Sequence, residues 1–398
     1  MALPPGPIAH PAIQTYRFIK EPLPFFEECR WHHGDLFTIQ MLGIGKCVHV
    51  CRPETVRELF PADPEHLHAG ASNSLIEPLG GKASVALADE RGHARMRRVL
   101  NLPLHGPKMR KHGRTMQDAA RFAMRDFRAG DVRAMLPLTQ DIPLEVILRV
   151  VFGIQSRDLL PEAAAAVLEM VTAYTPLLLI VPQTRRDFGR HSPGGRFARR
   201  RAVVDAWIRR EIKERRAAAD TERADVLSLL LIARDENDEP LTDDEIRDQL
   251  ITLFVDGQDT NSAALAWAMS LLHANPDVLE RLRAELATLG EDRDTEKMAQ
   301  LPYLLAVCNE ALRPVPTVLA ASRTAVKRPF RLEGWDIPPW ALSLSQRSSG
   351  PHQARTLPRA LAVSGRSASW SVTSSPGSSC PSGAARGGAS ESRSPPTR

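Results

Sequence analysis

One segment near the middle of the chain restricts the possible folds more than any other. In LTDDEIRDQLITLFVDGQDTNSAALAWAM, residues 241–269, Thr242 precedes an acidic first turn, which is the pattern of a capped helix start. The residues that follow are apolar on nearly every side of the helix. Such a helix needs other elements around it. The segment therefore predicts a long helix through the centre of a mainly α fold.

The rest of the first part of the chain supports the same class. Over residues 107–290 apolar residues recur at helical spacing, and Pro, Gly or Asp marks the ends of successive segments. A small β region is expected near the N-terminus, where two short strands flank Gly43–Lys46 and a helix begins at Glu54. Remnants of another β element surround residues 330–337. We predict one mainly α domain over residues 1–340.

The character of the sequence changes at residue 341. Residues 341–398 contain 16 serines and seven arginines, with a single acidic residue and no sustained helical or strand period. We predict a disordered tail there. The formal net charge of the chain is +5 and the tail alone carries +6, so residues 1–340 are close to neutral at −1. The basic balance gives no support for a nucleic-acid partner.

The five cysteines do not form a metal-binding pattern. No Cys-x-x-Cys pair occurs, and Cys47 and Cys51 have no downstream Cys or His pair at the spacing of a zinc site. Reduced thiols of this kind are typical of the cytoplasm. The N-terminus has no secretory pattern, and no stretch is apolar enough to span a membrane. We expect a cytoplasmic monomer without a membrane anchor.

The first candidate for function is the polar cluster of VDGQDTNS, inside the helix that should be most buried. Gly257 weakens the helix or lets another group approach its backbone. Asp259 and Thr260 place an acid and a hydroxyl at that point. The spacing fits a proton-relay or ligand site as well as it fits a helix kink with satisfied polar groups.

Two further candidates are charged. In CNEALRPVP, Glu310 and Arg313 share a helix face just before a proline, which fits either a surface ion pair or a buried one. In ERGHARMRRVLNLPLHG, His93 and Arg97 share a helix face, which fits a solvated basic surface or a clamp for carboxylates or phosphates. Spacing alone leaves both alternatives open in each case.

Taken in order, these segments resemble the cytochrome P450 family of haem-thiolate monooxygenases. The resemblance extends over residues 4–340 and includes GDLFTIQMLG, ETVRELF, GHARMRRVLNLPLHG, LFVDGQDTNSAALAWAM, LPYLLAVCNEALR and ASRTAVKRPFRLEGWDIPP. It implies the mainly α fold of that family. Two positions depart from the family pattern. Asp256 replaces the usual Ala or Gly before the glycine, and the segment between Arg313 and Pro316 is slightly short.

The resemblance also implies roles for individual residues. His93 and Arg97 would bind a haem propionate, with Arg323 as a third partner. Asp259 and Thr260 match the acid–alcohol pair that helps deliver protons to dioxygen at the haem. That chemistry needs the central helix to be opened beside the haem.

Glu310 and Arg313 would be the buried ion pair of the ExxR element, which is structural and supports the haem-binding core. The resemblance further implies heme b as cofactor and electrons from a separate ferredoxin or flavin reductase. The substrate would be a small apolar molecule into which one oxygen atom of O2 is inserted. Four apolar residues would line its pocket: Phe254, Val255, Val318 and Leu319.

The iron ligand of the family is missing. It is a Cys in the string F-G-x-G-x-R-x-C-x-G, whose thiolate favours O–O cleavage, and no such string occurs here. Cys380 lies at a suitable distance after Glu310. However, SSPGSSCPSG lacks the Phe, the first Gly and the Arg, so we do not assign Cys380 as the ligand.

A second reading frame accounts for the loss. In PSGAARGGASES, residues 381–392, codons read from the third base of one residue and the first two of the next permit F-G-G-G-P-R-R-C-L-G. The same shift in AVSGRSASW, residues 362–370, permits R-F-x-P-E-R-F-L, which resembles the family segment upstream of the haem loop. We infer a frameshift between residues 339 and 362, from a lesion in the gene or a sequencing error. The ligand Cys would straddle Gly388 and Ala389.

Two alternatives stay open at this point. The chain as written is a remnant that binds no haem, because the ligand loop and its following helix are lost. Or it is an all-helical binding protein without redox chemistry, in which the polar cluster is only a kink. Haem incorporation separates the family interpretation from the second alternative.

Overall fold

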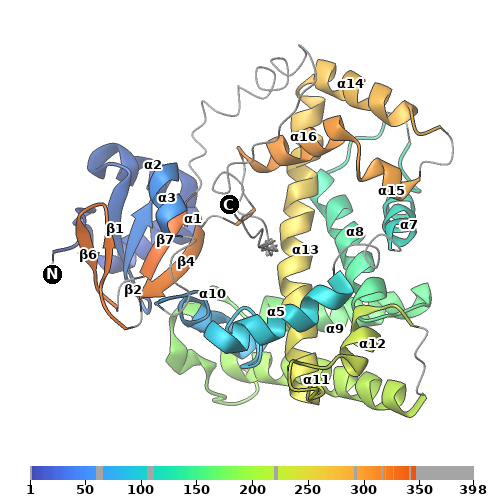
Figure 1. The fold of residues 1–398 in the computed structure, drawn as a ribbon, viewed down its shortest axis with the longest axis horizontal. Coiled ribbons are helices and arrows are strands. Elements are labelled where there is room, and N and C mark those ends of the chain that lie inside the picture. Colours follow the sequence, from blue (N-terminus) through green and yellow to red (C-terminus); the bar gives the residue numbers. More distant parts are fainter. Residues whose placement is uncertain are drawn as a thin grey trace, which may run out of the picture.

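A small mixed sheet packs beside a larger body of helices in this protein (Figure 1). The structure, a computed structural model, describes residues 2–59, 66–104, 112–128, 130–218, 223–290, 294–314, 317–318, 320–325, 327–339 and 342–346. Most of these residues are helical, which confirms the predicted mainly α class.

The helices follow one another along the chain as the apolar spacing predicts. They are α1 Pro11–Lys20, α2 Pro22–His33, α3 Pro53–Leu59, α4 Glu77–Gly80, α5 Glu90–Leu104, α7 Gly113–Ala123, α8 Met135–Val150, α9 Leu160–Ala173, α10 Pro176–Ile180, α11 Pro193–Ala218, α12 Val226–Ile232, α13 Asp243–His273, α14 Pro276–Ala287, α15 Thr295–Met298 and α16 Pro302–Leu312. Short 3₁₀ helices are η1 Ala71–Ile76, η2 Arg157–Leu159 and η3 Pro182–Arg185. Among the described residues, none of these helices has the length and apolar character needed to cross a membrane.

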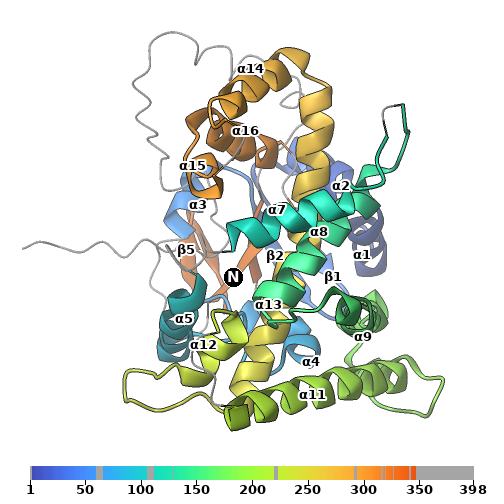
Figure 2. The ribbon, with the colours of Figure 1, turned by 90° about the vertical axis from the view of Figure 1, so that its right-hand side faces the viewer.

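The long helix α13 is the axis of the helical body, as predicted from its sequence. It begins with a capping box: the Glu245 backbone N–H donates to Thr242 Oγ1 at 3.2 Å, and the Thr242 N–H donates to Glu245 Oε2 at 2.9 Å. Figure 2 shows α8 lying along α13 and α11 crossing near its N-terminal end. The first half of α13 therefore belongs to the main hydrophobic core.

A buried arginine fixes that first half of α13. Arg247 is only 2% exposed, and its guanidinium donates to Asp205 of α11 at 2.6 Å and to Asp248 at 2.6 Å. Removing one partner of a buried ion pair leaves an uncompensated charge, which costs about 3–5 kcal/mol. The pairing therefore locks α13 to α11.

The sheet near the N-terminus has the strand order β1-β2-β7-β4-β3. Its strands are β1 Leu36–Met41, β2 Gly45–Val50, β3 Leu67–His68, β4 Ala320–Ala325 and β7 Leu342–Gln346. The hairpin of β1 and β2 and the helix that follows it confirm the predicted N-terminal β region. A separate hairpin of β5 Phe330–Leu332 and β6 Trp335–Ile337 confirms the second predicted β element.

Strand β7 contradicts one prediction. Residues 341–398 were expected to be disordered, yet Leu342–Gln346 form a strand that pairs parallel with β2 and antiparallel with β4. The alternating sequence LSLSQ has strand period, which the high serine content of the tail obscured. The boundary at residue 340 is therefore wrong by one short strand, and the rest of the tail lies outside the described residues.

Helix α8 continues through a proline. It begins at Met135 and contains Pro143 in its interior. A proline lacks one backbone N–H but does not always end a helix when tertiary packing holds both sides.

Candidate active site

The polar cluster of α13 lies in an unbroken stretch of α-helix. Thr260 Oγ1 donates to the Asp256 carbonyl, and Asn261 Nδ2 donates to the Gly257 carbonyl at 2.7 Å. Ser262 Oγ donates to the carbonyl four residues earlier at 2.6 Å. Side chains that bond these carbonyls compete with the backbone N–H groups of the helix. Helix α13 is nevertheless continuous through this point. The helix opening that the resemblance implies is therefore absent, although polar side chains that could accompany it are present.

Gly257 serves a close approach between helices. A Cβ placed on Gly257 would lie 3.1 Å from Ile147 Cδ1 of α8, which is tighter than ordinary contact. The sequence left open whether this glycine weakens α13 or admits a neighbour. The packing against α8 favours the second role.

The two acids of the cluster, Asp256 and Asp259, are both solvent-exposed. Protein atoms nevertheless crowd Asp256, and the resulting desolvation raises the pKa of its carboxyl above the usual range. Solvent still reaches this side chain, so desolvation is partial.

Two arginines and a histidine come together beside α5, one of the arginines from a distant part of the chain. His93 and Arg97 lie on α5, and Arg323 lies on β4. Desolvation lowers the pKa of His93, and the positive charges of Arg97 and Arg323 lower it further. The negative charge of Asp89 raises the pKa of His93 and so opposes the two arginines. The same carboxylate accepts hydrogen bonds from the backbone N–H groups of Gly70 and Ala71, at 2.8 Å each. The arrangement can hold an anionic group such as a carboxylate.

Glu310 and Arg313 form the ion pair expected at the end of α16. The contact is bidentate, with Arg313 Nε to Glu310 Oε2 at 2.9 Å and Nη2 to Oε1 at 2.7 Å. The two side chains are 13% and 35% exposed, respectively. The pair is therefore partly buried, between the two alternatives that the sequence left open.

The described thiols are not placed as iron ligands. Cys29, Cys47 and Cys51 lie in an apolar cluster between α2 and the sheet, and burial raises their pKa values to about 11, 12 and 12. Cys308 is exposed on α16 and also has a raised pKa. Among the described residues no group of three or more His, Cys, Asp or Glu side chains could hold a metal ion. Cys380 lies outside the described residues.

The residues expected to line a substrate pocket are not gathered in one place. Phe254 is buried and meets the ring of Phe152 edge-on, at 6.4 Å between centroids, so it belongs to the core. Val255 packs against the same core. Val318 is 58% exposed, and Leu319 lies outside the described residues.

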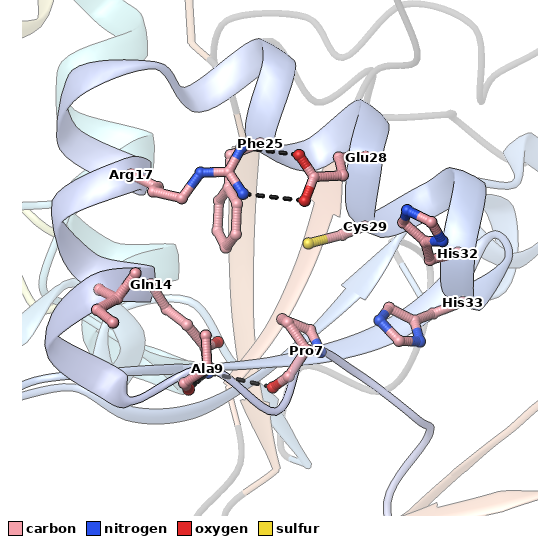
Figure 3. A pocket seen from close by; sticks show the side chains of 10 residues that line it. Pro7, Ala9, Gln14, Arg17, Phe25, Glu28, Cys29, His32 and His33 are labelled. Carbon is pink, nitrogen blue, oxygen red and sulfur yellow. Dashed lines mark hydrogen bonds and ion pairs between the residues drawn. The ribbon is translucent and has the colours of Figure 1, made fainter.

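A hollow near the N-terminus was not foreseen from the sequence (Figure 3). Its volume is about 110 Å³, and α1 and α2 contribute much of its lining. Arg17 donates to both Glu28 oxygens at 3.0 and 2.9 Å, and the Gln14 amide donates to the carbonyls of Pro7 and Ala9. These polar groups are hydrogen-bonded to one another. We therefore interpret the hollow as a packing contact between α1, α2 and the N-terminal segment.

A second unforeseen feature ties α13 to the loop after α4. Asp248 accepts the Ala83 N–H at 2.9 Å, and Gln249 accepts the Val85 N–H at 2.9 Å. Gln249 also donates to the Ala83 carbonyl. The polar run RDQ within the apolar helix was the available signal, but its partners are distant in the sequence.

Comparisons with known proteins agree on one family. The family model described as Cytochrome P450 matches residues 4–339. The chain is 32% identical over 338 residues to cytochrome P450 135A1 of Mycobacterium tuberculosis, covering 84% of this chain and 72% of the relative. It is 30% identical over 347 residues to cytochrome P450 135B1 of Mycobacterium bovis, covering 85% and 70%.

A solved structure has the same fold. The structure titled as retinoic acid-bound cyanobacterial CYP120A1 aligns with 93% of this chain and 85% of its own, with a TM-score of 0.75 and 22% sequence identity. That likeness concerns the architecture of the chain alone. The helices and the small sheet thus have a known arrangement.

Proposed function

Because this chain belongs to the cytochrome P450 family, we propose that its body is the scaffold of a haem-thiolate monooxygenase whose iron ligand a frameshift has removed. The family in general consists of haem-binding oxidoreductases of this kind. The haem supplies oxygen activation when a thiolate is bound to its iron. The residues of this chain would supply anchoring, proton delivery and the walls of the substrate site.

The observation that carries this proposal is the convergence of His93, Arg97 and Arg323. Two of these residues lie on α5 and the third lies on β4, far away in the sequence. The positive charges of Arg97 and Arg323 contribute to the lowered pKa of His93, which indicates that the three side chains lie near one another. Such a cluster is suited to the two carboxylates of a haem propionate edge. This half of the haem site fits the residues present.

The other half does not fit. Burial raises the pKa of all four described cysteines, which disfavours the thiolate that would bind iron, so no step through iron follows from the described residues. The frameshift is supported by the extent of the family match, which stops at residue 339 while more than a quarter of the first relative stays unmatched. As written, the chain would be an inactive remnant.

In the frame-restored protein we assign the acid–alcohol pair to proton transfer. Asp259 is exposed and able to exchange protons with water, and Thr260 already has its hydroxyl directed to a helix carbonyl. The substrate would be a small apolar molecule, and a ferredoxin or flavin reductase would donate electrons. The Glu310–Arg313 pair would hold the end of α16 in place.

The test of this proposal is haem binding by a frame-restored protein and its variants. Arg97→Ala removes one cation of the cluster, and we expect about tenfold weaker haem binding, in line with the strength of charge-assisted hydrogen bonds. Arg98→Ala is the matched control, because Arg98 lies on the same helix but pairs with Glu236 at the surface. Equal affinity of the two variants in a haem titration, followed by absorbance, would contradict the proposal.

A further inference from the structure

His68 lies between two carboxylates at the start of α5. Its Nδ1 is 3.5 Å from Asp89 Oδ2, and its Nε2 is 3.1 Å from Glu90 Oε1. His68 belongs to β3, whereas Glu90 is the first residue of α5 and Asp89 directly precedes it. The side chains of His68 and Asp89 are only 15% and 20% exposed. The imidazole therefore joins two elements at a point that is largely removed from water.

The positions of the two ring nitrogens match the charged form of this imidazole. A neutral imidazole has one N–H donor, so it can donate to only one of two carboxylates, whereas the imidazolium has two N–H donors. The cation can therefore serve Asp89 and Glu90 together. Hydrogen bonds between charged groups are also stronger than neutral ones. Because histidine gains or loses this proton near neutral pH, the contact should depend on pH.

The backbone at Glu90 is held in an unfavourable conformation. Its φ is 49°, in the left-handed region that residues other than glycine rarely adopt. Such a conformation costs free energy and persists where surrounding contacts hold it. Lys327 Nζ lies 3.4 Å from Glu90 Oε1, and Lys327 and His68 together lower the pKa of this carboxyl. The first turn of α5 is therefore fixed by contacts of the Glu90 side chain.

Asp89 extends the contact to the segment after β3 and from there to β4. Its carboxylate accepts the backbone N–H groups of Gly70 and Ala71. The hydroxyl oxygen of Ser72, the next residue, is 2.8 Å from that of Ser322 on β4. The strand β4 also carries the arginine that approaches α5. A continuous set of polar contacts thus joins the start of α5 to this strand.

The basic residues of α5 follow these acids directly. The His93 N–H donates to the Asp89 carbonyl at 3.1 Å, and Arg97 lies one turn further along the helix. The orientation of the first turn of α5 therefore decides how His93 and Arg97 face Arg323.

Several titratable and charged groups surround the His68 contact, from α5, from β4 and its flank, and from the chain just before β3: Asp89, Glu90, His93, Arg97, Arg323, Lys327 and His66. Lysine and arginine keep their charge near neutral pH. Desolvation, together with Arg97 and Arg323, lowers the pKa of His93, and His66 is buried beside the ring of Phe330. His68 is the histidine of this group that contacts two carboxylates.

We propose that His68 is a positioning residue that fixes the start of α5 when its imidazole is protonated. The imidazolium bridges Asp89 and Glu90, and this bridge keeps His93 and Arg97 directed towards the strand of Arg323. When the proton leaves, one carboxylate loses its donor and the start of α5 loosens. The inference rests on the proposed function, since that function gives these three basic side chains an anionic group to bind.

The first test needs no haem and uses both the full 398-residue chain and the frame-restored protein. Hydrogen exchange, corrected for intrinsic rates, measures the protection of the Gly70 and Ala71 amides, which Asp89 accepts. We expect about tenfold higher protection at about pH 5.5 than at about pH 8, as one charge-assisted hydrogen bond allows. His68→Gln keeps a donor without a charge and should show low protection at both pH values. His68→Arg keeps the charge and should show high protection at both.

The matched control is His191→Gln, which removes an exposed histidine on the loop before α11. This variant should keep the pH dependence of the unaltered protein. Equal protection at the two pH values in the unaltered protein, or the same pH dependence in His68→Gln, would overturn the inference. Loss of the pH dependence in His191→Gln would overturn it as well, because general charge would then be the cause.

Haem titration of the frame-restored protein separates this inference from the proposed function. We expect haem to bind about threefold or more weakly at about pH 8 than at about pH 6, and this difference should vanish in His68→Arg. Amide protection that depends on His68 in a frame-restored protein without haem uptake supports the positioning of α5 and counts against the proposed function. Haem binding whose pH dependence is unchanged in His68→Gln supports the proposed function and overturns the inference.

Discussion

His49 is the single residue whose surroundings most clearly disfavour its charged form. It is fully buried on β2 between the rings of Phe26 and Phe37, and neither of its ring nitrogens has a hydrogen-bond partner. Burial lowers its pKa from 6.5 to about 3. The imidazole therefore stays neutral in the folded protein at neutral pH, and both of its nitrogens are desolvated without compensation.

Replacing His49 with an apolar residue of similar size should stabilise the protein. We expect His49→Leu to raise the free energy of unfolding at neutral pH by about 1–3 kcal/mol, because a buried unsatisfied polar group is removed. The folded pKa lies below the unfolded one. The contribution of the neutral His49 imidazole to the free energy of unfolding is therefore fully present above the unfolded pKa of 6.5. It is lost as the pH falls toward the folded pKa of about 3.

Urea unfolding of both proteins at neutral and acidic pH checks this prediction. The unaltered protein should lose more stability than His49→Leu between these two conditions. A variant that is less stable at neutral pH, or that loses the same stability in acid, would show that the ring nitrogens have partners in solution.

At the scale of elements, helix α16 is apolar on two sides but covered on one. Val307 and Ala311 are buried on the side that packs with α13 and α14. Leu305 and Leu312 are 47% and 37% exposed, and Cys308 is exposed between them. These three residues lie on one helix face at i, i+3 and i+7. Such a stripe is normally covered in a native protein.

If the proposed frameshift removed a segment that covers this stripe, the reactivity of the Cys308 thiol would report it. We expect a maleimide to label Cys308 readily in the chain as written and at least about tenfold more slowly once the frame is restored, because the restored segment would pack over the stripe. Cys47 is fully buried and should stay unlabelled in both proteins, which makes it the internal control. Equal labelling of Cys308 in both proteins would contradict this assignment.

Elements with a strong local pattern could be predicted from the sequence, and those set by distant partners could not. Thr242 and Glu245 mark the start of α13 within four residues, so the capped start was correctly predicted. The Arg247–Asp205 pair joins two helices far apart in the sequence, and no local spacing reveals it. The residues of the candidate site divide in the same way, into those with a local sequence pattern and those whose contacts are distant in the sequence. The Glu310–Arg313 pair could be foreseen, whereas the tight fit of Gly257 against α8 needed the structure.

The errors also have physical causes. Strand β7 was missed because the serine-rich composition of the tail obscured the alternation of LSLSQ, and its partners β2 and β4 are distant in the sequence. The helix opening expected near Thr260 is absent. Three consecutive side chains bond helix carbonyls there, and the helix continues through them. In both cases the sequence could not reveal which partner each backbone group would find.

At the scale of the whole molecule, the family match ends close to the proposed frameshift. The helices, the group of His93, Arg97 and Arg323, and the ion pair of α16 all belong to the first 339 residues, where the family match lies, whereas strand β7 follows it. The ligand loop would belong to the segment after that match. The proposed shift of reading frame would explain both the agreement up to that point and the missing ligand motif beyond it.

The measurement that tests this account most directly is the carbon monoxide difference spectrum of the reduced protein. It compares the purified 398-residue chain with a frame-restored version after both have been supplied with haemin. We predict that only the frame-restored protein shows the red-shifted Soret band of thiolate ligation. A thiolate-type band in the chain as written would mean that one of its own cysteines binds iron. The central claim would then be wrong.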